Sequence, residues 1–304
     1  MSSGSKVPSF KTSLALVWFG VSLILMSDPS STVSSVSYAE EDAGLMGSLK
    51  ALRKVPSGQV LLARAEKAWK ISGDEAILGF LKNDSVSRTD AVLTRHYDPV
   101  TGKESRERQV TVYIRKEQSF EDRTLDLAHE LTHATAAPSW DPYDPNLTAG
   151  KYVWAALEAP GGEIEAVVME CQVGLQLSRI LPFQVPRCHR YLGAHSVLDA
   201  NKVRQDFYRV GRWKSEVTEK LQAEHVLFPL LSSEKPELYS STGRAPYPLA
   251  LIREFTELNQ IACENARRRV SSQAQSGRSP ASTAPTSGAS PDPVAALLAR
   301  RCSI

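Results

Sequence analysis

The sequence has little net charge and no segment long enough to cross a membrane comfortably. Lysine and arginine number 36 against 34 aspartate and glutamate residues, so the formal charge is only +2. The basic residues are scattered rather than clustered, which removes the electrostatic case for binding nucleic acid. The apolar run Leu14–Met26 has thirteen residues, which are too few to span a bilayer comfortably.

Cysteine is scarce, and its spacing excludes one class of metal site. The chain has four cysteines, with no CxxC pair among them, so a cysteine-based zinc site has no support. An even number permits disulfides in an oxidising compartment. Three pairings are open, and we favour Cys188 with Cys263 because both lie outside the metal region described below.

The N-terminal segment has the pattern of an export signal. Lys6 and Lys11 precede the apolar run, and Ser37-Tyr38-Ala39 offers small residues suited to cleavage after Ala39. We therefore expect residues 1–39 to be a signal peptide and the mature protein to be periplasmic or secreted. The alternative is an uncleaved N-terminal anchor, because the gap between the apolar run and the cleavage site is long.

The rest of the chain predicts an α+β fold that is mostly helical. Apolar spacing indicates helices through 43–83, and a change of period predicts a β-hairpin with strands near 91–98 and 108–116. Ser119 is the expected N-cap of the next helix, which ends before Pro138. Further helices are expected at 161–181, 199–222, 248–269 and in the last twelve residues, with a loop at 138–152. We expect one catalytic domain at 40–269 and a disordered Ser/Pro/Ala-rich tail at 270–304.

Histidine is scarce too, with six in the chain, yet His129 and His133 stand four residues apart with Glu130 between them. Positions i and i+4 lie on one face of a helix, so both imidazoles can bind one metal ion. Glu130 then projects beside them as a general base. The flanking residues are uncharged, as a buried metal-bearing helix requires.

This HExxH motif resembles that of the zincin metallopeptidases, over residues 109–178. The extended metzincin form is excluded, because Ala136 and Ser139 stand where it needs glycine and histidine. The gluzincin form takes a glutamate from a second helix, within an E-x-x-A pattern that Glu163 and Ala166 match. The resemblance implies Zn²⁺, a zincin-like fold with the hairpin beside the motif helix, and hydrolysis of a protein or peptide substrate.

The helical wheel of the second helix favours Glu163 as the third ligand. Glu165 falls on the same side as Gln172 and Gln176, which we interpret as a solvent face. Glu163 and Glu170 fall on the apolar side, where a carboxylate needs a cation or a hydrogen-bond donor. We therefore predict Glu163 as a ligand and Glu170 as the hydrogen-bond partner of a ligating histidine. Glu170 and Glu158 are the alternatives to Glu163. Many gluzincins carry an acidic residue where this chain has Val167.

Other polar residues are weaker candidates. His189, Tyr191 or His195 could stabilise a developing oxyanion, and Asp126 could orient a ligand or favour its helix N-terminus. The functional hypothesis is a zinc metallopeptidase with Glu130 as general base. The alternatives are a non-catalytic zinc-binding envelope or scaffold protein and a secreted effector. No nucleic-acid partner is expected, and no membrane span unless the N-terminal segment is retained.

Overall fold

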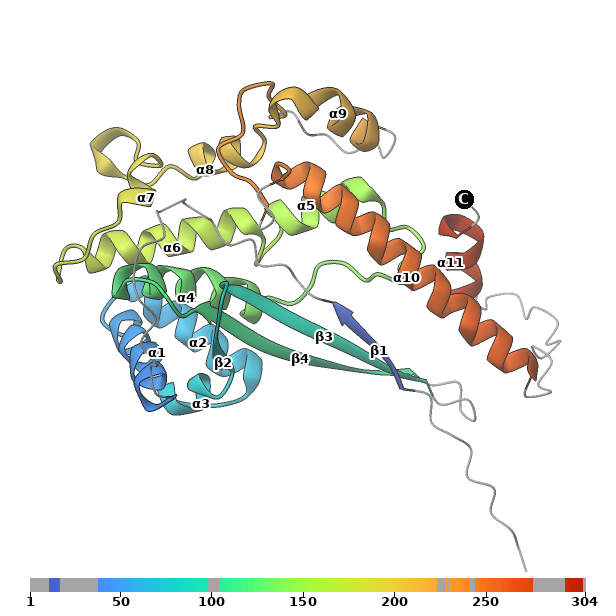
Figure 1. The fold of residues 1–304 in the computed structure, drawn as a ribbon, viewed down its shortest axis with the longest axis horizontal. Coiled ribbons are helices and arrows are strands. Elements are labelled where there is room, and N and C mark those ends of the chain that lie inside the picture. The colour runs from blue at the N-terminus through green and yellow to red at the C-terminus, as the bar shows by residue number, and fades with distance from the viewer. Residues whose placement is uncertain are drawn as a thin grey trace, which may run out of the picture. The chain divides into compact units, whose positions relative to one another are not determined.

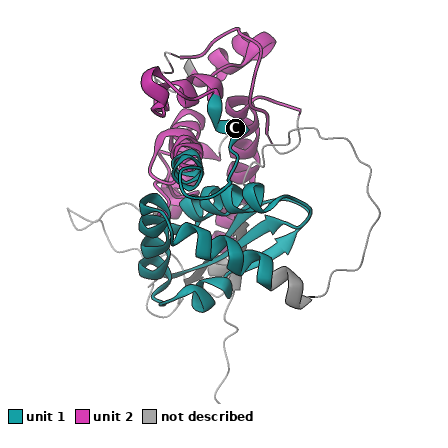
Figure 2. Ribbon diagram, turned by 90° about the vertical axis from the view of Figure 1, so that its left-hand side faces the viewer, with its two compact units in different colours: residues 1–135, 169–189 teal, residues 136–168, 190–304 magenta. Residues whose placement is uncertain are grey.

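The computed structural model describes residues 11–16, 38–97, 104–222, 228, 230–240, 244–275 and 293–302. The chain forms two compact units (Figure 2). The first comprises Met1–Thr135 with Met169–His189, and the second comprises Ala136–Val168 with Arg190–Ile304. Most of the described residues are helical, and the strands form one sheet in the first unit, so the α+β class is correct at this level.

The sheet of the first unit is mixed. Strands β3 (Arg88–Tyr97) and β4 (Glu104–Arg115) pair antiparallel, which confirms the predicted hairpin; its expected turn at 99–102 lies outside the described residues. Strand β2 (Leu81–Asp84) pairs in parallel with β4, in a region expected to be helical. The sequence of β2, LKND, has one apolar residue and no alternation that would mark a strand. The predicted antiparallel sheet is therefore corrected to a mixed one.

One further strand lies inside the expected signal peptide. Strand β1 (Lys11–Leu16) pairs antiparallel with β3 and completes the order β1-β3-β4-β2. Helix α1 (Tyr38–Leu52) begins before the expected cleavage point at Ala39. The remainder of the apolar run lies outside the described residues, and cleavage of this segment stays a prediction.

Helix α4 (Phe120–Thr135) is the central element of the first unit. Its N-cap is Ser119, as predicted, because the Asp122 amide donates to Ser119 Oγ at 3.0 Å. The helix packs against β3 and β4 and contacts α1 and α2 (Pro56–Trp69), as Figure 1 shows. A short helix, α3 (Asp74–Leu78), follows α2. These neighbours bury most of α4 from Thr124 to Ala134, including the polar side chains of His129, Glu130 and His133.

Helix α6 (Glu163–Leu177) is the predicted second helix, and the chain then forms the single turn α7 (Pro186–His189). A disulfide joins Cys171 to Cys188, and a second joins Cys263 to Cys302. The preferred pairing of Cys188 with Cys263 is therefore wrong. The bonded cysteines Cys171 and Cys188 are only 17 residues apart. They meet because α7 folds back onto α6, the helix that carries the expected ligand Glu163.

The second unit is helical. Helix α10 (Tyr247–Gln275) packs against α5 (Ala149–Glu158) and α11 (Pro293–Arg301). Helix α5 replaces the last part of a predicted loop and is capped by the Thr148 hydroxyl. The expected helix at 199–222 is divided into α8 (Ala200–Phe207), η2 (Gly211–Trp213) and α9 (Lys214–Gln222), and η1 (Ala194–Ser196) precedes them. The division falls at Gly211, whose φ of 57° is left-handed.

The expected disordered tail contains described structure at both ends. Val270 to Gln275 continue α10, and α11 is the short helix predicted near the C-terminus. The disulfide between Cys263 and Cys302 ties that helix back to α10. The intervening residues 276–292, to which the disorder prediction still applies, lie outside the described residues. Among the described residues, no helix combines the length and apolar character that a membrane crossing requires.

Candidate metal centre

Helix α4 places His129 and His133 one turn apart and buries both. Their exposed fractions are 9% and 5%. The two Nε2 atoms face each other at 3.1 Å. A tetrahedral ion with bonds of about 2.0–2.1 Å holds two ligand nitrogens about 3.3–3.4 Å apart. The imidazoles therefore already have nearly the separation that joint coordination of one ion requires.

Glu163, the first residue of α6, joins this pair. Its side chain is buried, and its carboxylate oxygen lies with one nitrogen of His129 and one of His133 inside a group whose atoms are all within 4.8 Å of one another. Glu165 is only partly buried, and it accepts a hydrogen bond from the Gly161 amide at 2.7 Å. The group therefore contains the glutamate that the helical wheel favoured, whereas Glu165 caps its own helix.

Glu170 occupies the supporting position predicted for it. Its Oε2 lies 3.0 Å from His129 Nδ1. With Nδ1 protonated, His129 donates this hydrogen bond and keeps the Nε2 lone pair for a metal ion. Glu170 also belongs to a second group of potential ligands with Cys171 and Cys188. The two sulfurs of that group are bonded to each other, so they are not available as thiolates.

Glu130 is almost completely buried, with an exposed fraction of 1%. The Thr89 hydroxyl, on β3, lies 2.8 Å from Glu130 Oε2 and 2.9 Å from its backbone oxygen. Thr89 therefore fixes the carboxylate of the expected general base. The sequence gives no sign of this contact, because threonine is common in strands and the pairing across 41 residues is tertiary.

The remaining candidates have other partners or are exposed. Asp126 accepts hydrogen bonds from Ser87 at 2.6 Å and from Arg187 at 3.0 Å, so it binds side chains rather than serving only the helix N-terminus. His189 and His195 are exposed. Tyr191 is buried, and its hydroxyl contacts Arg190 at 2.6 Å. None of the last three belongs to the group of potential ligands, and an oxyanion role for any of them stays a prediction.

Negative charge accumulates around Glu163 within the second unit. Burial, together with the charges of Glu163 and Glu257, raises the pKa of Glu254, on α10, to about 7. A hydrogen bond with Tyr152 acts in the opposite direction. Carboxylates gathered at one place repel one another, and a bound cation relieves this repulsion. This electrostatic setting and the nitrogen and oxygen donors fit a divalent metal ion.

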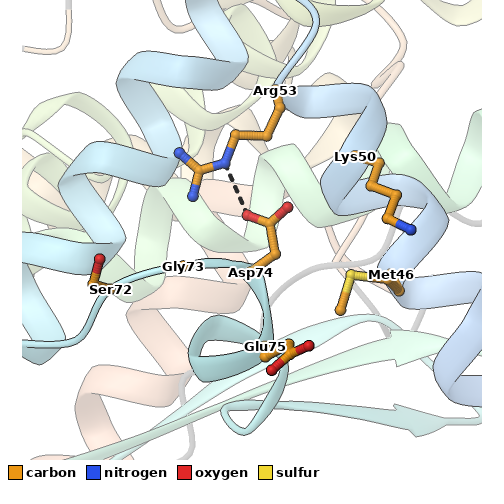
Figure 3. Close-up of a pocket in the computed structure, with 7 residues that line it drawn as sticks. All are labelled: Met46, Lys50, Arg53, Ser72, Gly73, Asp74 and Glu75. Atoms are coloured by element: carbon orange, nitrogen blue, oxygen red, sulfur yellow. Dashed lines mark hydrogen bonds and ion pairs between the residues drawn. The ribbon is translucent and has the colours of Figure 1, made fainter.

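A pocket of about 600 Å³ lies elsewhere in the first unit (Figure 3). Arg53 in this pocket is paired with Asp74 at 2.8 Å and with Glu66 at 2.6 Å, which ties α1, α2 and α3 together. Its charge is therefore already compensated. The pocket contains none of the grouped ligands, and its lining residues are Met46, Lys50, Arg53, Ser72, Gly73, Asp74 and Glu75.

No family model matches the chain, and neither a curated protein nor a solved structure proves similar to it. The case for the site therefore rests on its geometry. The buried group of His129 and His133 on α4 and Glu163 on α6 resembles an HExxH-like site and could hold a metal ion.

Proposed function

We propose that this protein is a zinc-dependent metallopeptidase of gluzincin type. The observation that carries the proposal is the buried group of His129, His133 and Glu163, with ligand atoms within 4.8 Å of one another. Two histidines and one glutamate are a donor set of catalytic zinc sites, which keep a fourth position for water or substrate. A structural site usually closes all four positions with protein ligands.

Zinc is the metal that this donor set fits best. Imidazole suits zinc and other transition metals, whereas magnesium and calcium prefer oxygen ligands throughout. Bound zinc would act as a Lewis acid and activate water for attack on a carbonyl group. The chain's own contribution is to fix the ligands: the Glu170 carboxylate orients His129 through Nδ1 at 3.0 Å.

Glu130 is the general base of the proposed reaction. It takes a proton from the attacking water and passes it to the leaving amine. The Thr89 hydroxyl at 2.8 Å holds one carboxylate oxygen, so the side chain is preorganised for this transfer. A general base has no role in a purely structural site, which favours the peptidase over a scaffold protein. The choice of a peptide bond as substrate comes from the resemblance of the HExxH motif.

The proposed enzyme acts outside the cytoplasm. Two disulfides use all four cysteines and suggest an oxidising location, extracellular or periplasmic. We expect the mature chain to begin near Glu40. N-terminal sequencing of the protein from its native host tests this, and an intact Met1 in a soluble cytoplasmic fraction would exclude export.

A peptide-library digestion with three matched proteins tests the function. The wild type should release peptides, Glu130→Gln should retain zinc without releasing them, and His129→Ala should lose both zinc and activity. Glutamine keeps the size of Glu130 and removes its basicity, so this variant separates binding from chemistry. Equal hydrolysis by Glu130→Gln would refute the mechanism. Stoichiometric zinc without hydrolysis by the wild type would favour the non-catalytic alternative.

A further inference from the structure

Arg187, on the single turn α7, is a buried cation that the proposed reaction does not use. Its side chain is 9% exposed. Both terminal nitrogens lie 3.0 Å from Asp126 Oδ1, and Nε lies 2.7 Å from Glu170 Oε1. Burial alone would lower the pKa of Arg187, but the charges of Glu170 and Asp126 outweigh this and raise it. Arg187 therefore remains charged and bridges two carboxylates.

The Glu170 carboxylate uses its two oxygens for different partners. Oε1 faces Arg187 at 2.7 Å, and Oε2 faces His129 Nδ1 at 3.0 Å. A carboxylate held at one oxygen by a planar guanidinium has its second oxygen fixed in direction. The interactions thus run from Asp126 on α4, through Arg187 and Glu170, back to His129 on α4. They fix the imidazole that presents Nε2 to His133 at 3.1 Å.

The Cys171–Cys188 disulfide joins α6 and α7 directly beside this ion pair. Cys171 follows Glu170 directly, and Cys188 follows Arg187. Helix α7 has only four residues, and a single turn does not hold itself in place. The cross-link therefore supplies a covalent constraint that keeps Arg187 against Glu170.

We propose that Arg187 is a positioning residue of the metal centre, kept in register by the Cys171–Cys188 disulfide, so that zinc affinity depends on this cross-link. The inference rests on the proposed function, because it requires His129 to be a zinc ligand. A dithiol reductant would weaken the site by thiol–disulfide exchange: two electrons pass to the cystine, two thiols form, and the dithiol closes to its own disulfide.

The second unit offers a matched control. Arg301 is also buried, and it also precedes a disulfide cysteine, Cys302, which is bonded to Cys263. Its guanidinium donates to the backbone oxygen of Pro142 at 3.0 Å and to Asn259. Neither Pro142 nor Asn259 belongs to the group of potential metal ligands. Variants of Arg301 and of the Cys263–Cys302 disulfide therefore show the general effect of losing a buried arginine or a disulfide. Any larger effect in the Arg187 or Cys171–Cys188 variants comes from lost support for His129.

Zinc affinity of the full chain, measured by competition with a chromogenic chelator, tests the proposal. Arg187→Gln should weaken zinc binding about 10- to 100-fold, the range typical of partners that orient a ligating histidine. Arg187→Lys keeps the charge without the planar fork and should fall between this variant and the wild type. Arg301→Gln should bind zinc as the wild type does. Circular dichroism of each variant shows whether it is folded at the temperature of the titration.

The cysteine variants provide the second arm. Cys171→Ala/Cys188→Ala should weaken zinc binding, whereas Cys263→Ala/Cys302→Ala should not. Alanine is used because thiols left by reduction could themselves bind zinc. Wild-type affinity in folded Arg187→Gln, or in Cys171→Ala/Cys188→Ala if the arginine variant does not fold, would overturn the proposal. Failure of the wild type to bind zinc would instead overturn the proposed function.

Discussion

Gly174 allows α6 to approach α4, and adding one methyl group there should disturb both stability and the metal site. Gly174 lies one turn beyond Glu170, on the same face of α6. A Cβ at this position would lie 2.5 Å from Val185 Cγ1 and 2.8 Å from Leu125 Cδ2. Carbon atoms in favourable contact are about 3.5–4.0 Å apart. Val185 and Leu125 are buried, with exposed fractions of 3% and 1%, so neither can move without displacing its neighbours.

The expected magnitude for Gly174→Ala is the difference between two opposing effects. Overpacking of a well-packed core costs about 1–3 kcal/mol. Alanine in place of glycine inside a helix returns about 0.5–1 kcal/mol. The free energy of unfolding should therefore fall by up to about 2.5 kcal/mol. The outward shift of α6 should also separate Glu170 from His129 and weaken zinc binding by about tenfold, as loss of a ligand-orienting contact does.

Gly47→Ala is the matched control for this prediction. A Cβ at Gly47, on α1, would meet only Phe120 Cε2 at 3.7 Å, an ordinary contact. This variant should be stabilised by about 0.5–1 kcal/mol and should bind zinc normally. Urea unfolding and chelator competition on both variants provide the comparison. Equal stability and equal zinc affinity in the two variants would show that close helix packing at Gly174 does not position the site.

Three further predictions concern the site. Glu163→Gln should weaken zinc binding by orders of magnitude and Glu165→Gln should leave it nearly intact, because a neutral amide oxygen is a poor zinc donor; the opposite result would reverse the assignment. Thr89→Val should retain zinc but lower kcat by roughly ten- to a hundredfold, the worth of a hydrogen bond to a charged group, with Thr89→Ser as the rescuing control; unchanged kcat would refute the role of Thr89. The pKa of Glu254 in the folded state is raised to about 7, so the folded protein favours the protonated carboxyl. The free energy of unfolding of the metal-free wild type should therefore fall relative to that of Glu254→Gln as the pH rises from about 5 through 7. A difference in urea unfolding that does not change with pH would contradict this.

The features that the sequence predicted correctly are local ones. The Ser119 cap is formed with Asp122, three residues away. The hairpin follows from alternating residues on two strands that are neighbours in the chain. The facing imidazoles of His129 and His133 follow from helix periodicity alone, and so does the common face of Glu163 and Glu170.

The features that sequence reasoning missed depend on tertiary contacts. Thr89 meets Glu130 across 41 residues, and Arg187 meets Asp126 across 61. No periodicity relates such positions. The disulfide prediction failed for the same reason, because it assumed that Cys188 lies outside the metal region, whereas α7 returns Cys188 to Cys171. The first residues of helix α5 fall within the predicted loop at 138–152, where prolines and aspartates precede them.

Metal content of the purified domain from residue 40 tests the central claim most directly. The account predicts close to one zinc ion per chain for the wild type, measured by inductively coupled plasma mass spectrometry after dialysis. It predicts loss of that zinc in His129→Ala/His133→Ala, because one remaining protein ligand cannot hold the ion. Circular dichroism of both proteins establishes that they are folded. Stoichiometric zinc in the folded double variant, or none in the wild type supplied with zinc, would contradict the assignment of the metal centre.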